Sequence, residues 1–362
     1  MERCSKCVIP DTFPGIRINP EGVCSFCTQA PENEVPRCPG NPDQLLALVA
    51  KHRLADSPYD CAVKLSGGRD STYVLYYAVR ILGLRVLALT VDHGLLPEHT
   101  RENIRKAVSI LNVGHVVMRN TAMEGITRAM LSAWLQRPSA ATVALLCLGC
   151  HRAMHVALAD AARRNGSPLI LNGVGEAGVH DYLATRFFAP GEAGWKAHLK
   201  IATGFGREFL RNPRFLASPH IVRMMIGEYV AVMSDRWRNR KSAGLKEISL
   251  FGYVPWDEDT IVQTIQRELD WRPWPAVEAT WRSDCKLAVL KTQFYLFTTG
   301  FSLQDAMIAG LVRTGRISRA AGIQRLAREN LLNPQLVEEV LQDIGVPIPS
   351  AFRKFLIDRS AA

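Results

Sequence analysis

Between residues 59 and 171 the chain alternates short apolar runs with stretches of helical spacing. The first apolar run spans residues 61–65, and after a Gly-Gly turn the apolar side chains of residues 71–82 recur every three or four positions. The pattern predicts strands at 61–65, 85–91, 115–118 and 169–171, and helices at 71–82, at 98–111 and in two further stretches before the last strand. Because strands that alternate with helices form parallel sheets covered on both faces, we expect a doubly wound α/β domain whose strand series closes at residue 171.

The rest of the chain has a different pattern. Residues 1–42 are rich in proline and cysteine and show little apolar periodicity, so they cannot bury a core unaided. After about residue 185 the alternation fades, and residues 196–246 hold eleven Lys or Arg against three acidic residues. From residue 257 the pattern is helical, with Asp257, Ser302 and Asn333 as expected N-caps and Gly315, Gly322 and Gly345 as expected breaks. We therefore expect four segments: an N-terminal module (1–42), the α/β domain (43–185), a basic insertion or substrate region (186–256) and a helical region (257–362).

Composition narrows the class of protein. A chain of 362 residues, 48% of them hydrophobic, is long enough for two or three domains with sizeable cores. Its start lacks the apolar stretch of a signal peptide, and no run approaches the about 18 apolar residues of a membrane helix, so we expect a soluble, cytoplasmic protein without a membrane partner. The net charge of +10 favours an anionic partner such as a nucleotide, a sugar-nucleotide or RNA. In a reducing compartment, nine cysteines indicate metal or redox chemistry more than disulfides.

The strongest local motif directly follows a predicted strand and opens a predicted helix. It reads Ser66-Gly67-Gly68-Arg69-Asp70-Ser71. Its glycines let backbone N–H groups approach an anion, the helix N-terminus adds about half a positive charge, and its serines can donate hydroxyl hydrogen bonds, so the motif predicts a phosphate-binding loop. The loop is not a Walker A loop, because the Gly-x-x-x-x-Gly-Lys spacing is absent. A carboxylate in such a loop would repel its ligand unless a cation intervened, so we expect Asp70 to bind Mg²⁺; the alternative is a tight Gly-Gly turn capped by Asp70.

Two Cys-x-x-Cys pairs near the N-terminus predict a metal site. The four residues are Cys4, Cys7, Cys24 and Cys27. Two pairs of this form supply four thiolates in a tetrahedron, which is the geometry that structural Zn²⁺ prefers. The metal would supply the folding energy that this proline-rich segment lacks, so we expect a zinc-ribbon-like module in which zinc is structural and not catalytic.

The phosphate loop resembles that of the PP-loop ATP pyrophosphatases, adenine nucleotide α-hydrolase-like enzymes whose signature is Ser-Gly-Gly-x-Asp-Ser. The resemblance implies a HUP-like fold and cleavage of ATP to AMP and pyrophosphate, with the AMP placed on a substrate oxygen that a nitrogen or sulfur nucleophile then replaces. Arg69 stands where many of these relatives carry Lys, and either side chain offers positive charge to the phosphates. The turn after the second strand looks like the family's second nucleotide-binding turn and places Asp92 at the carboxyl edge of the sheet. Gly173 and Glu176 would border the nucleotide; a plain turn residue at Asp92 and a solvated acid at Glu176 remain the alternatives.

The N-terminal module is similar to the opening of the N-acetyl sugar amidotransferases of surface-polysaccharide biosynthesis. The likeness runs through residues 3–16, 21–24 and 59–61 and returns at residues 311–319, Leu-Val-Arg-Thr-Gly-Arg-Ile-Ser-Arg, but it is weak between 185 and 280. It implies conversion of an acetamido group on an anionic or sugar-nucleotide substrate into an acetamidino group, with ammonia supplied by a separate glutaminase subunit. Adenylation suits this chemistry, since it converts the amide oxygen into a good leaving group.

Three more cysteines leave a second enzyme hypothesis open. Cys147 and Cys150 precede a helical stretch, and Cys285 stands alone further along the chain. Three such thiolates could hold a 4Fe-4S cluster with one open iron, or relay sulfur as a persulfide. This arrangement resembles the PP-loop tRNA-thiolation enzymes and implies a sulfurtransferase, fed by a sulfur donor, that acts on tRNA or a small molecule. The alternative is that the three are small buried hydrophobic residues.

Other features have less weight. A non-catalytic RNA-binding protein, with zinc knuckles and a basic segment, is a third hypothesis, against which the intact phosphate loop argues. His151 and His155 share one helix face, but without the Glu of a zinc hydrolase motif we expect them to pack or to be solvated. Four tryptophans, at 256, 271, 274 and 281, are expected to pack against the C-terminal helices more than to stack on a sugar or base.

Overall fold

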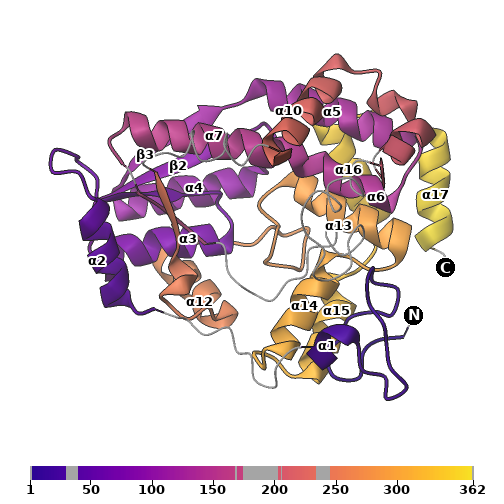
Figure 1. The fold of residues 1–362 in the computed structure, drawn as a ribbon, viewed down its shortest axis with the longest axis horizontal. Coiled ribbons are helices and arrows are strands. Elements are labelled where there is room, and N and C mark those ends of the chain that lie inside the picture. Colours follow the sequence, from indigo (N-terminus) through magenta and orange to yellow (C-terminus); the bar gives the residue numbers. More distant parts are fainter. Residues whose placement is uncertain are drawn as a thin grey trace.

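The part of the chain that the structure describes contains a sheet of five parallel strands. In the computed structural model, which describes residues 2–29, 40–167, 169–173, 203–204, 206–233 and 245–360, the strands are β1 (Cys61–Lys64), β2 (Val86–Asp92), β3 (Gly114–Arg119), β4 (Leu169–Asn172) and β5 (Lys246–Ser249). Their spatial order is β3-β2-β1-β4-β5. The chain moves outward from β1 to β3 and then returns to place β4 on the other side of β1 (Figure 1). Open parallel sheets bind ligands outside the carboxyl ends of the strands at such a switch point, here between β1 and β4.

Helices cover both faces of this sheet and build the rest of the molecule. Those that precede β5 are α1 (Ser25–Gln29), α2 (Pro42–His52), α3 (Arg69–Tyr76) with a π-helical extension η1 (Tyr77–Ile81), α4 (Glu98–Leu111), α5 (Thr121–Gln136), α6 (Ala140–Val143), the 3₁₀ turn η2 (Ala144–Cys147), α7 (Leu148–Arg164), η3 (Pro213–Phe215) and α10 (Pro219–Met233). Those that follow it are η4 (Leu250–Gly252), α12 (Glu258–Leu269), α13 (Lys286–Thr299), α14 (Leu303–Arg313), α15 (Arg319–Glu329), α16 (Pro334–Ile344) and α17 (Ser350–Ser360). No helix among the described residues is long and apolar enough to cross a membrane.

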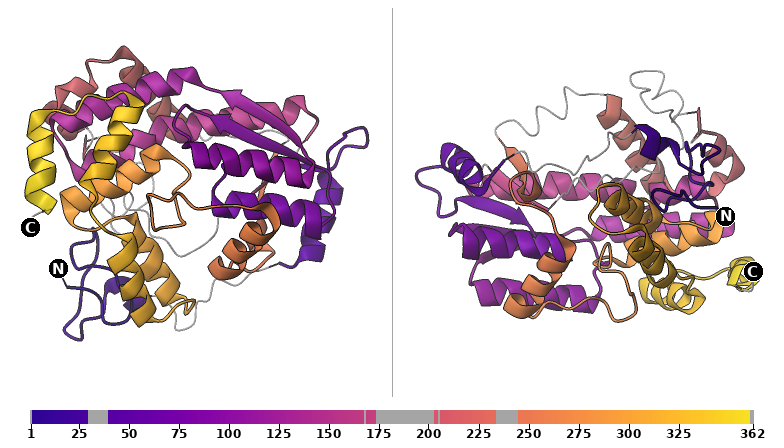
Figure 2. Two further views of the ribbon diagram at one scale, coloured as in Figure 1. Left: turned by 180° about the vertical axis from the view of Figure 1, so that it is seen from behind. Right: turned by 90° about the horizontal axis from the view of Figure 1, so that it is seen from below.

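Alternate side chains of the strands form two apolar layers, as expected for a doubly wound sheet. On one face, Ala62 and Leu89 of the strands are buried together with Leu158 and Ala162 of α7. On the other face, the intervening strand residues share a buried cluster with α3 and α4. The helices therefore lie on opposite sides of the strands (Figure 2). The predicted α/β fold is confirmed.

The first four predicted strands are confirmed to within one residue at each end, and the helix predicted at 98–111 is α4. The prediction that residue 171 closes the series is wrong. β5 pairs in parallel with β4, so the sheet takes a strand from the segment that we expected to be a basic insertion. The pattern concealed this strand because it has only four residues, two of them the charged Lys246 and Glu247, and only Ile248 is buried. After β5, α12 packs against α3.

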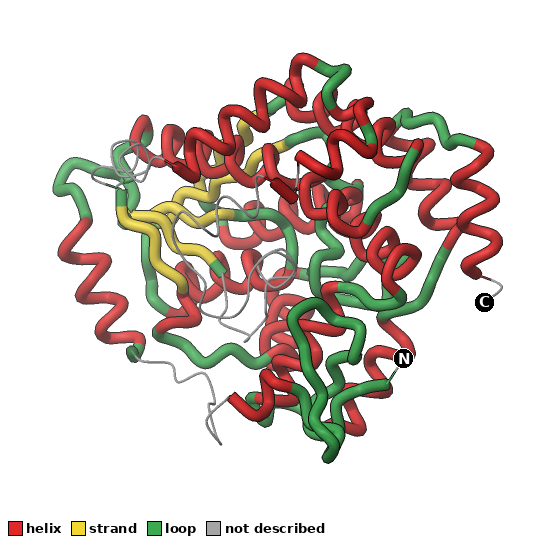
Figure 3. Tube along the Cα trace, turned by 45° about the vertical axis from the view of Figure 1, so that its right-hand side comes forward, coloured by secondary structure: helices red, strands yellow, loops and turns green. Residues whose placement is uncertain are grey.

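The C-terminal helices form the other half of the molecule, and the N-terminal module lies against α14 and α15 (Figures 1 and 3). The module contains two short antiparallel bridges, which give it a ribbon-like form. The ring of Phe13 lies 5.3 Å from that of Phe301, just before α14. The N-terminal module is thus packed against the start of α14.

Most of the predicted helix limits in this half are confirmed. Asp257, Ser302 and Asn333 cap α12, α14 and α16 by accepting backbone hydrogen bonds, and Gly345 ends α16 with a positive φ. The break predicted at Gly322 is wrong, because this residue lies within α15. A Cβ there would lie 2.9 Å from a methyl group of Val312 in α14. The absence of a side chain at Gly322 therefore allows α14 and α15 to pack closely.

One ion pair ties the N-terminal module to α14. The Asp305 side chain is fully buried and accepts hydrogen bonds from Arg3 Nη1 at 2.6 Å, from the Ser302 backbone N–H at 2.7 Å and from Asn330 Nδ2 at 2.6 Å. Removing a buried carboxylate that accepts from three donors destabilises the fold far more than removing one partner of a surface ion pair. The reason is that the three buried donors are left without an acceptor.

We therefore expect Asp305→Ala to lower the free energy of unfolding by about 3 kcal/mol. Urea unfolding followed by circular dichroism measures the change. Glu98→Ala is the matched control, because the Glu98–Arg105 pair is exposed at both ends and its loss should leave the unfolding midpoint unchanged. Equal midpoints for the Asp305→Ala variant and the wild type would contradict the proposed role of the buried pair.

Candidate active site

Residues 66–71 form a loop between β1 and α3, at the switch point of the sheet. Gly67 has a φ of +82°, and a Cβ at this position would lie 2.7 Å from the Thr100 methyl group, so the loop requires glycine here. The two serines brace the loop: their hydroxyl oxygens lie 3.0 Å apart, and the Ser66 backbone N–H donates to Ser71 Oγ at 3.2 Å. These contacts fix the loop without help from a ligand.

Two other segments approach this loop closely. Gly68 is the N-cap of α3 and provides no side-chain cap, so the first N–H groups of the helix are open to an anion. A Cβ on Gly68 would lie 2.9 Å from Asp284 Oδ2, and one on Gly173, just after β4, would lie 3.1 Å from the backbone of Asp70. The structure thus places Gly173 beside the loop, and it adds a second carboxylate, Asp284, that the sequence did not single out. Contact of Gly173 with a nucleotide stays a prediction.

The Asp70 carboxylate is held by its neighbours but is not closed off. Trp256 Nε1 donates to Oδ1 at 3.1 Å and Arg69 Nε does so at 3.2 Å, while 24% of the Asp70 side chain remains exposed. Desolvation raises the pKa of Asp70, and the adjacent Arg69 charge only partly offsets this effect. A carboxylate whose ionised form is stabilised by additional positive charge is a suitable ligand for Mg²⁺. Metal binding by Asp70 stays a prediction.

Arg69 is part of a buried chain of ion pairs. Its side chain is 2% exposed, pairs with Glu258 at the start of α12 and donates to Thr280 Oγ1 at 2.8 Å. Glu258 also pairs with Arg325 of α15 at 2.6 Å, and Arg325 pairs with Glu329 at 2.7 Å. Although burial opposes ionisation of Glu258, the two arginines hold its pKa below the usual value. The charge of Arg69 is therefore balanced within the protein, and its predicted contact with phosphates stays a prediction.

Asp92 is the last residue of β2 and lies at the carboxyl edge of the sheet, as predicted. Its carboxylate accepts hydrogen bonds from the Gly94 backbone N–H at 3.0 Å and from Arg101 Nη2 at 3.2 Å. These contacts outweigh burial and lower the pKa of Asp92. The same turn reaches α13, because the Leu95 carbonyl accepts the Lys286 backbone N–H at 3.0 Å. A role for Asp92 in ATP binding stays a prediction.

The structure brings Cys147, Cys150 and Cys285 to one region beside this turn. Cys147 is the N-cap of α7, Cys150 lies in the first turn of that helix, and Cys285 is the N-cap of α13. Burial raises the pKa of Cys285, and the neighbouring Cys147 and Cys150 raise it further; burial also raises the pKa of Cys150 to about 12. At neutral pH these two are thiols, which require a metal or another cation to ionise. An iron–sulfur cluster or a persulfide at this place stays a prediction.

The four N-terminal cysteines come together as predicted. Their sulfur atoms all lie within 4.8 Å of one another, which holds for no other group of three or more potential ligands among the described residues. Backbone N–H groups of Cys7 and Cys24 point at Cys4 Sγ, at 3.4 and 3.2 Å. Hydrogen bonds from the Cys27 and Cys7 thiols lower the pKa of Cys24. Four thiols in so compact a group fit a tetrahedral metal ion; that the ion is zinc stays a prediction.

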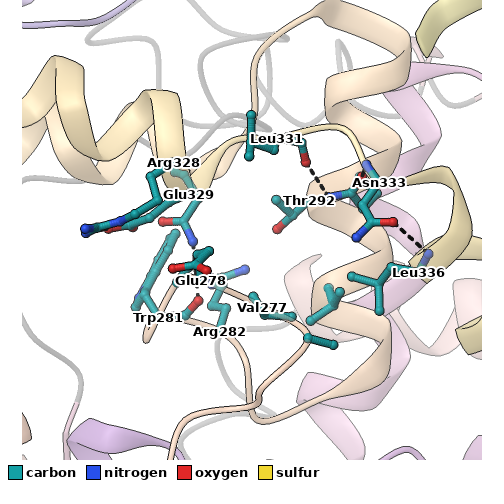
Figure 4. A pocket seen from close by; sticks show the side chains of 15 residues that line it. Val277, Glu278, Trp281, Arg282, Thr292, Arg328, Glu329, Leu331, Asn333 and Leu336 are labelled. Atoms are coloured by element: carbon teal, nitrogen blue, oxygen red, sulfur yellow. Dashed lines mark hydrogen bonds and ion pairs between the residues drawn. The ribbon is translucent and has the colours of Figure 1, made fainter.

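A separate cavity of about 110 Å³ lies between residues 276–282 and the helices α13 to α16 (Figure 4). Trp281 from the loop and Arg328 and Glu329 from α15 line one side of it. The lining includes Gln304, which is 2% exposed and whose Oε1 has no hydrogen-bond partner within the described ranges. No residue of the loop at 66–71 lines this cavity, so it is distinct from the phosphate site.

Two tryptophans have a role that the sequence did not reveal. Trp256 Nε1 donates to Asp70, and Trp271 Nε1 donates to the Gly67 carbonyl at 3.0 Å. Both rings are buried, at 8% and 3% exposure, and their N–H groups position the loop, whereas their packing against the C-terminal helices stays a prediction. The sequence shows that the tryptophans cluster along the chain, but this clustering does not indicate which residues they contact.

Part of the predicted site falls on residues that the structure does not describe. Glu176 lies outside the described residues, as do Lys196, Lys200, Arg236, Arg238, Arg240 and Lys241 of the basic segment. The side chain of His151 is also outside them, whereas His155 is 60% exposed, as expected for a solvated position. The roles predicted for these side chains therefore remain predictions.

No protein-family model and no curated protein matches the sequence. Among solved structures, NMN synthetase from Francisella tularensis matches with a TM-score of 0.36 and 10% identity, over 80% of this chain and 94% of that chain. The NH3-dependent NAD synthetase from Campylobacter jejuni matches with a TM-score of 0.30 and 16% identity, over 57% of this chain and 96% of that chain. Likeness at this level does not carry an activity from one protein to another, so the function proposed below rests on this chain's own residues.

The cysteine module gives a direct test. Cys24→Ser should reduce bound zinc from about one ion per chain to a small fraction, because a tetrahedral site that loses one thiolate binds zinc far more weakly. Elemental analysis by mass spectrometry measures the metal, and a thermal melt should show a lower midpoint. Cys61→Ser is the control, since Cys61 is buried in β1 and should affect stability but not zinc content. Full zinc content in the Cys24→Ser protein would exclude a four-thiolate site.

Proposed function

We propose that the protein is an ATP-dependent enzyme that activates an amide oxygen as its adenylate and then replaces it with nitrogen. The observation that carries the proposal is the loop at residues 66–71, an uncapped helix N-terminus with a partly exposed Asp70 at the switch point of a parallel sheet. The substrate that best suits the motifs at both ends of the chain is an N-acetyl sugar, carried on an anionic group or a nucleotide.

In the first step the substrate's amide oxygen attacks the α-phosphorus of ATP. The bond between the α-phosphorus and the bridging oxygen breaks, the pyrophosphate leaves with the electron pair, and the amide N–H proton is lost to give a neutral adenylated imidate. The open N–H groups of α3 would bind the phosphates, and Asp70 would hold Mg²⁺, which supplies positive charge to the departing pyrophosphate. Asp284, which lies against Gly68, is a second carboxylate beside the loop.

In the second step neutral ammonia attacks the activated carbon. The carbon–oxygen bond breaks, AMP leaves with the electron pair, and the product is an acetamidino group that takes up a proton. A separate glutaminase subunit would supply the ammonia. Because ammonia is neutral, it can reach the carbon through an apolar route that excludes water, which would otherwise hydrolyse the adenylate.

The first step predicts AMP and pyrophosphate as the products of ATP, formed only when the amide substrate is present. Asp70→Asn should lower kcat by about 100-fold or more, since loss of one electrostatic stabiliser of a transition state costs about 3–4 kcal/mol. Chromatography of the nucleotides identifies the products. Formation of ADP and orthophosphate, or equal rates in the two proteins, would refute this assignment. Asp259→Asn is the control, because Asp259 lies in the exposed first turn of α12.

The raised pKa of Asp70 predicts the pH dependence. A carboxyl whose pKa lies above its ordinary value of 3.8 remains protonated at a pH where other aspartates are ionised. Activity that requires the ionised form should therefore fall with decreasing pH through this raised value. The acid limb of kcat/KM should move to lower pH as Mg²⁺ is increased, because the metal and the proton compete for the same oxygen. If the acid limb does not shift with Mg²⁺, the pH dependence arises from a group other than Asp70.

A sulfurtransferase is the second candidate, and the grouping of Cys147, Cys150 and Cys285 beside the Asp92 turn favours it. Sulfur would replace the same activated oxygen on tRNA or a small molecule. A sulfide must be held by soft ligands, which thiolates or an open iron of a 4Fe-4S cluster provide, whereas ammonia needs no such ligand. The three cysteines thus have a chemical role only in this second scheme.

Single changes of the three cysteines to Ala separate these candidates. In an amidotransferase they should cost stability, by about 1–3 kcal/mol for each buried side chain, and leave ammonia-dependent turnover largely intact. Turnover is measured with ammonium salts as the nitrogen source. About four irons per chain in anaerobically purified protein, lost in Cys285→Ala, together with no activity on ammonia would favour sulfur insertion instead.

A further inference from the structure

Arg316, which follows α14, reaches Trp256, a residue that contacts the phosphate loop. Its guanidinium carbon is 5.0 Å from the ring centre of Trp256, the residue whose indole N–H donates to Asp70. Trp256 also lies 5.1 Å from the Arg69 guanidinium carbon. One indole therefore contacts two cations and the loop's carboxylate, so Arg316 and Asp70 share Trp256 as a common neighbour.

The neighbouring arginines fix the segment that carries Arg316. Arg313 Nη1 lies 3.8 Å from Cys7 Sγ, and Arg319 Nε donates to the carbonyls of Cys4 and Cys7, both at 3.1 Å. Arg313 and Arg319 thus contact the N-terminal cysteine module, whereas Arg316, midway between them, lies over the Trp256 ring.

Unlike the other two cations at this site, Arg316 has no salt bridge within the described part of the chain. Arg69 and Arg325 both pair with Glu258. The acid whose charge acts on Arg316 is Asp257, which already caps α12 by accepting the Thr260 backbone N–H at 2.8 Å. Desolvation lowers the pKa of Arg316 and the charge of Asp257 opposes this effect only in part, so the protein keeps a partly buried cation at an energetic cost. An anionic ligand would offset it.

We propose that Arg316 binds the pyrophosphate part of ATP and stabilises it as it leaves. When the bond between the α- and β-phosphates breaks, the pyrophosphate gains a negative charge, and a guanidinium beside the loop can share two N–H groups with its oxygens. Arg316 then supplies the free cation that Arg69, balanced by Glu258, does not provide. This inference rests on the proposed cleavage of ATP and adds a phosphate-binding residue to it.

The test compares the binding of the two product fragments by isothermal titration calorimetry. In the presence of Mg²⁺, Arg316→Gln should weaken pyrophosphate binding by about 10- to 100-fold, the loss typical of a charge-assisted hydrogen bond, and leave AMP binding within about twofold of the wild type. Arg316→Lys should retain an intermediate affinity, because it keeps the charge but not the planar pair of donors. Arg267→Gln is the matched control, since Arg267 is exposed on α12 and its bond is to the adjacent Glu268.

Unchanged pyrophosphate affinity in Arg316→Gln would overturn the proposal. An equal loss of AMP and pyrophosphate in both Arg316 variants would also overturn it, because that result indicates a structural role for the side chain. A wild-type protein that binds neither fragment would refute the proposed function and the inference together. A wild type that binds both, with an Arg316→Gln variant that loses neither, refutes the inference alone.

Discussion

The arrangement of the site depends on the buried ion pair between Arg69 and Glu258. Arg69 belongs to the phosphate loop and Glu258 begins α12, so this contact joins the α/β half of the protein to segments that follow the last strand. Glu258 in turn holds Arg325, which fixes α15. Because a buried charge without its partner is strongly destabilising, the loop, α12 and α15 can keep their places only together. The loop is thereby set before any ligand binds, which is the condition under which its dipoles contribute most to catalysis.

The cysteine module extends this coupling to the start of the chain. It contacts α14 through Arg3 and Asp305, and it meets the segment between α14 and α15 through Arg313 and Arg319. That segment contacts Trp256, whose indole N–H donates to Asp70. A metal that orders the module would therefore influence the phosphate loop without taking part in the chemistry. This explains why motifs at both ends of the chain accompany one loop in its middle.

The parts of the structure that the sequence predicted are those encoded locally. A short strand with three apolar residues in a row, a Gly-Gly turn and a helix define the loop within a short window, and the paired cysteines define their own site. β5 was missed because two of its four residues are charged and its neighbour β4 lies more than seventy residues earlier. The contacts of Trp256, Glu258 and Asp284 with the loop could not be inferred, since each depends on how distant segments pack and not on the spacing of residues along the chain.

The surroundings of the three inner cysteines bear on the choice between nitrogen and sulfur chemistry. Cys150 is buried and Cys285 is partly buried, and desolvation favours their neutral thiol forms. A neutral thiol is neither a good nucleophile nor a metal ligand, so a sulfur-transfer role requires a charge that lowers these pKa values. Within the described residues, the cation that acts on Cys150 is Lys291 of α13, and its effect is smaller than that of burial. Ammonia is a neutral nucleophile and needs no such ionisation. Burial in this region thus favours neutral thiols, and sulfur chemistry would need a bound metal or another cation to ionise them.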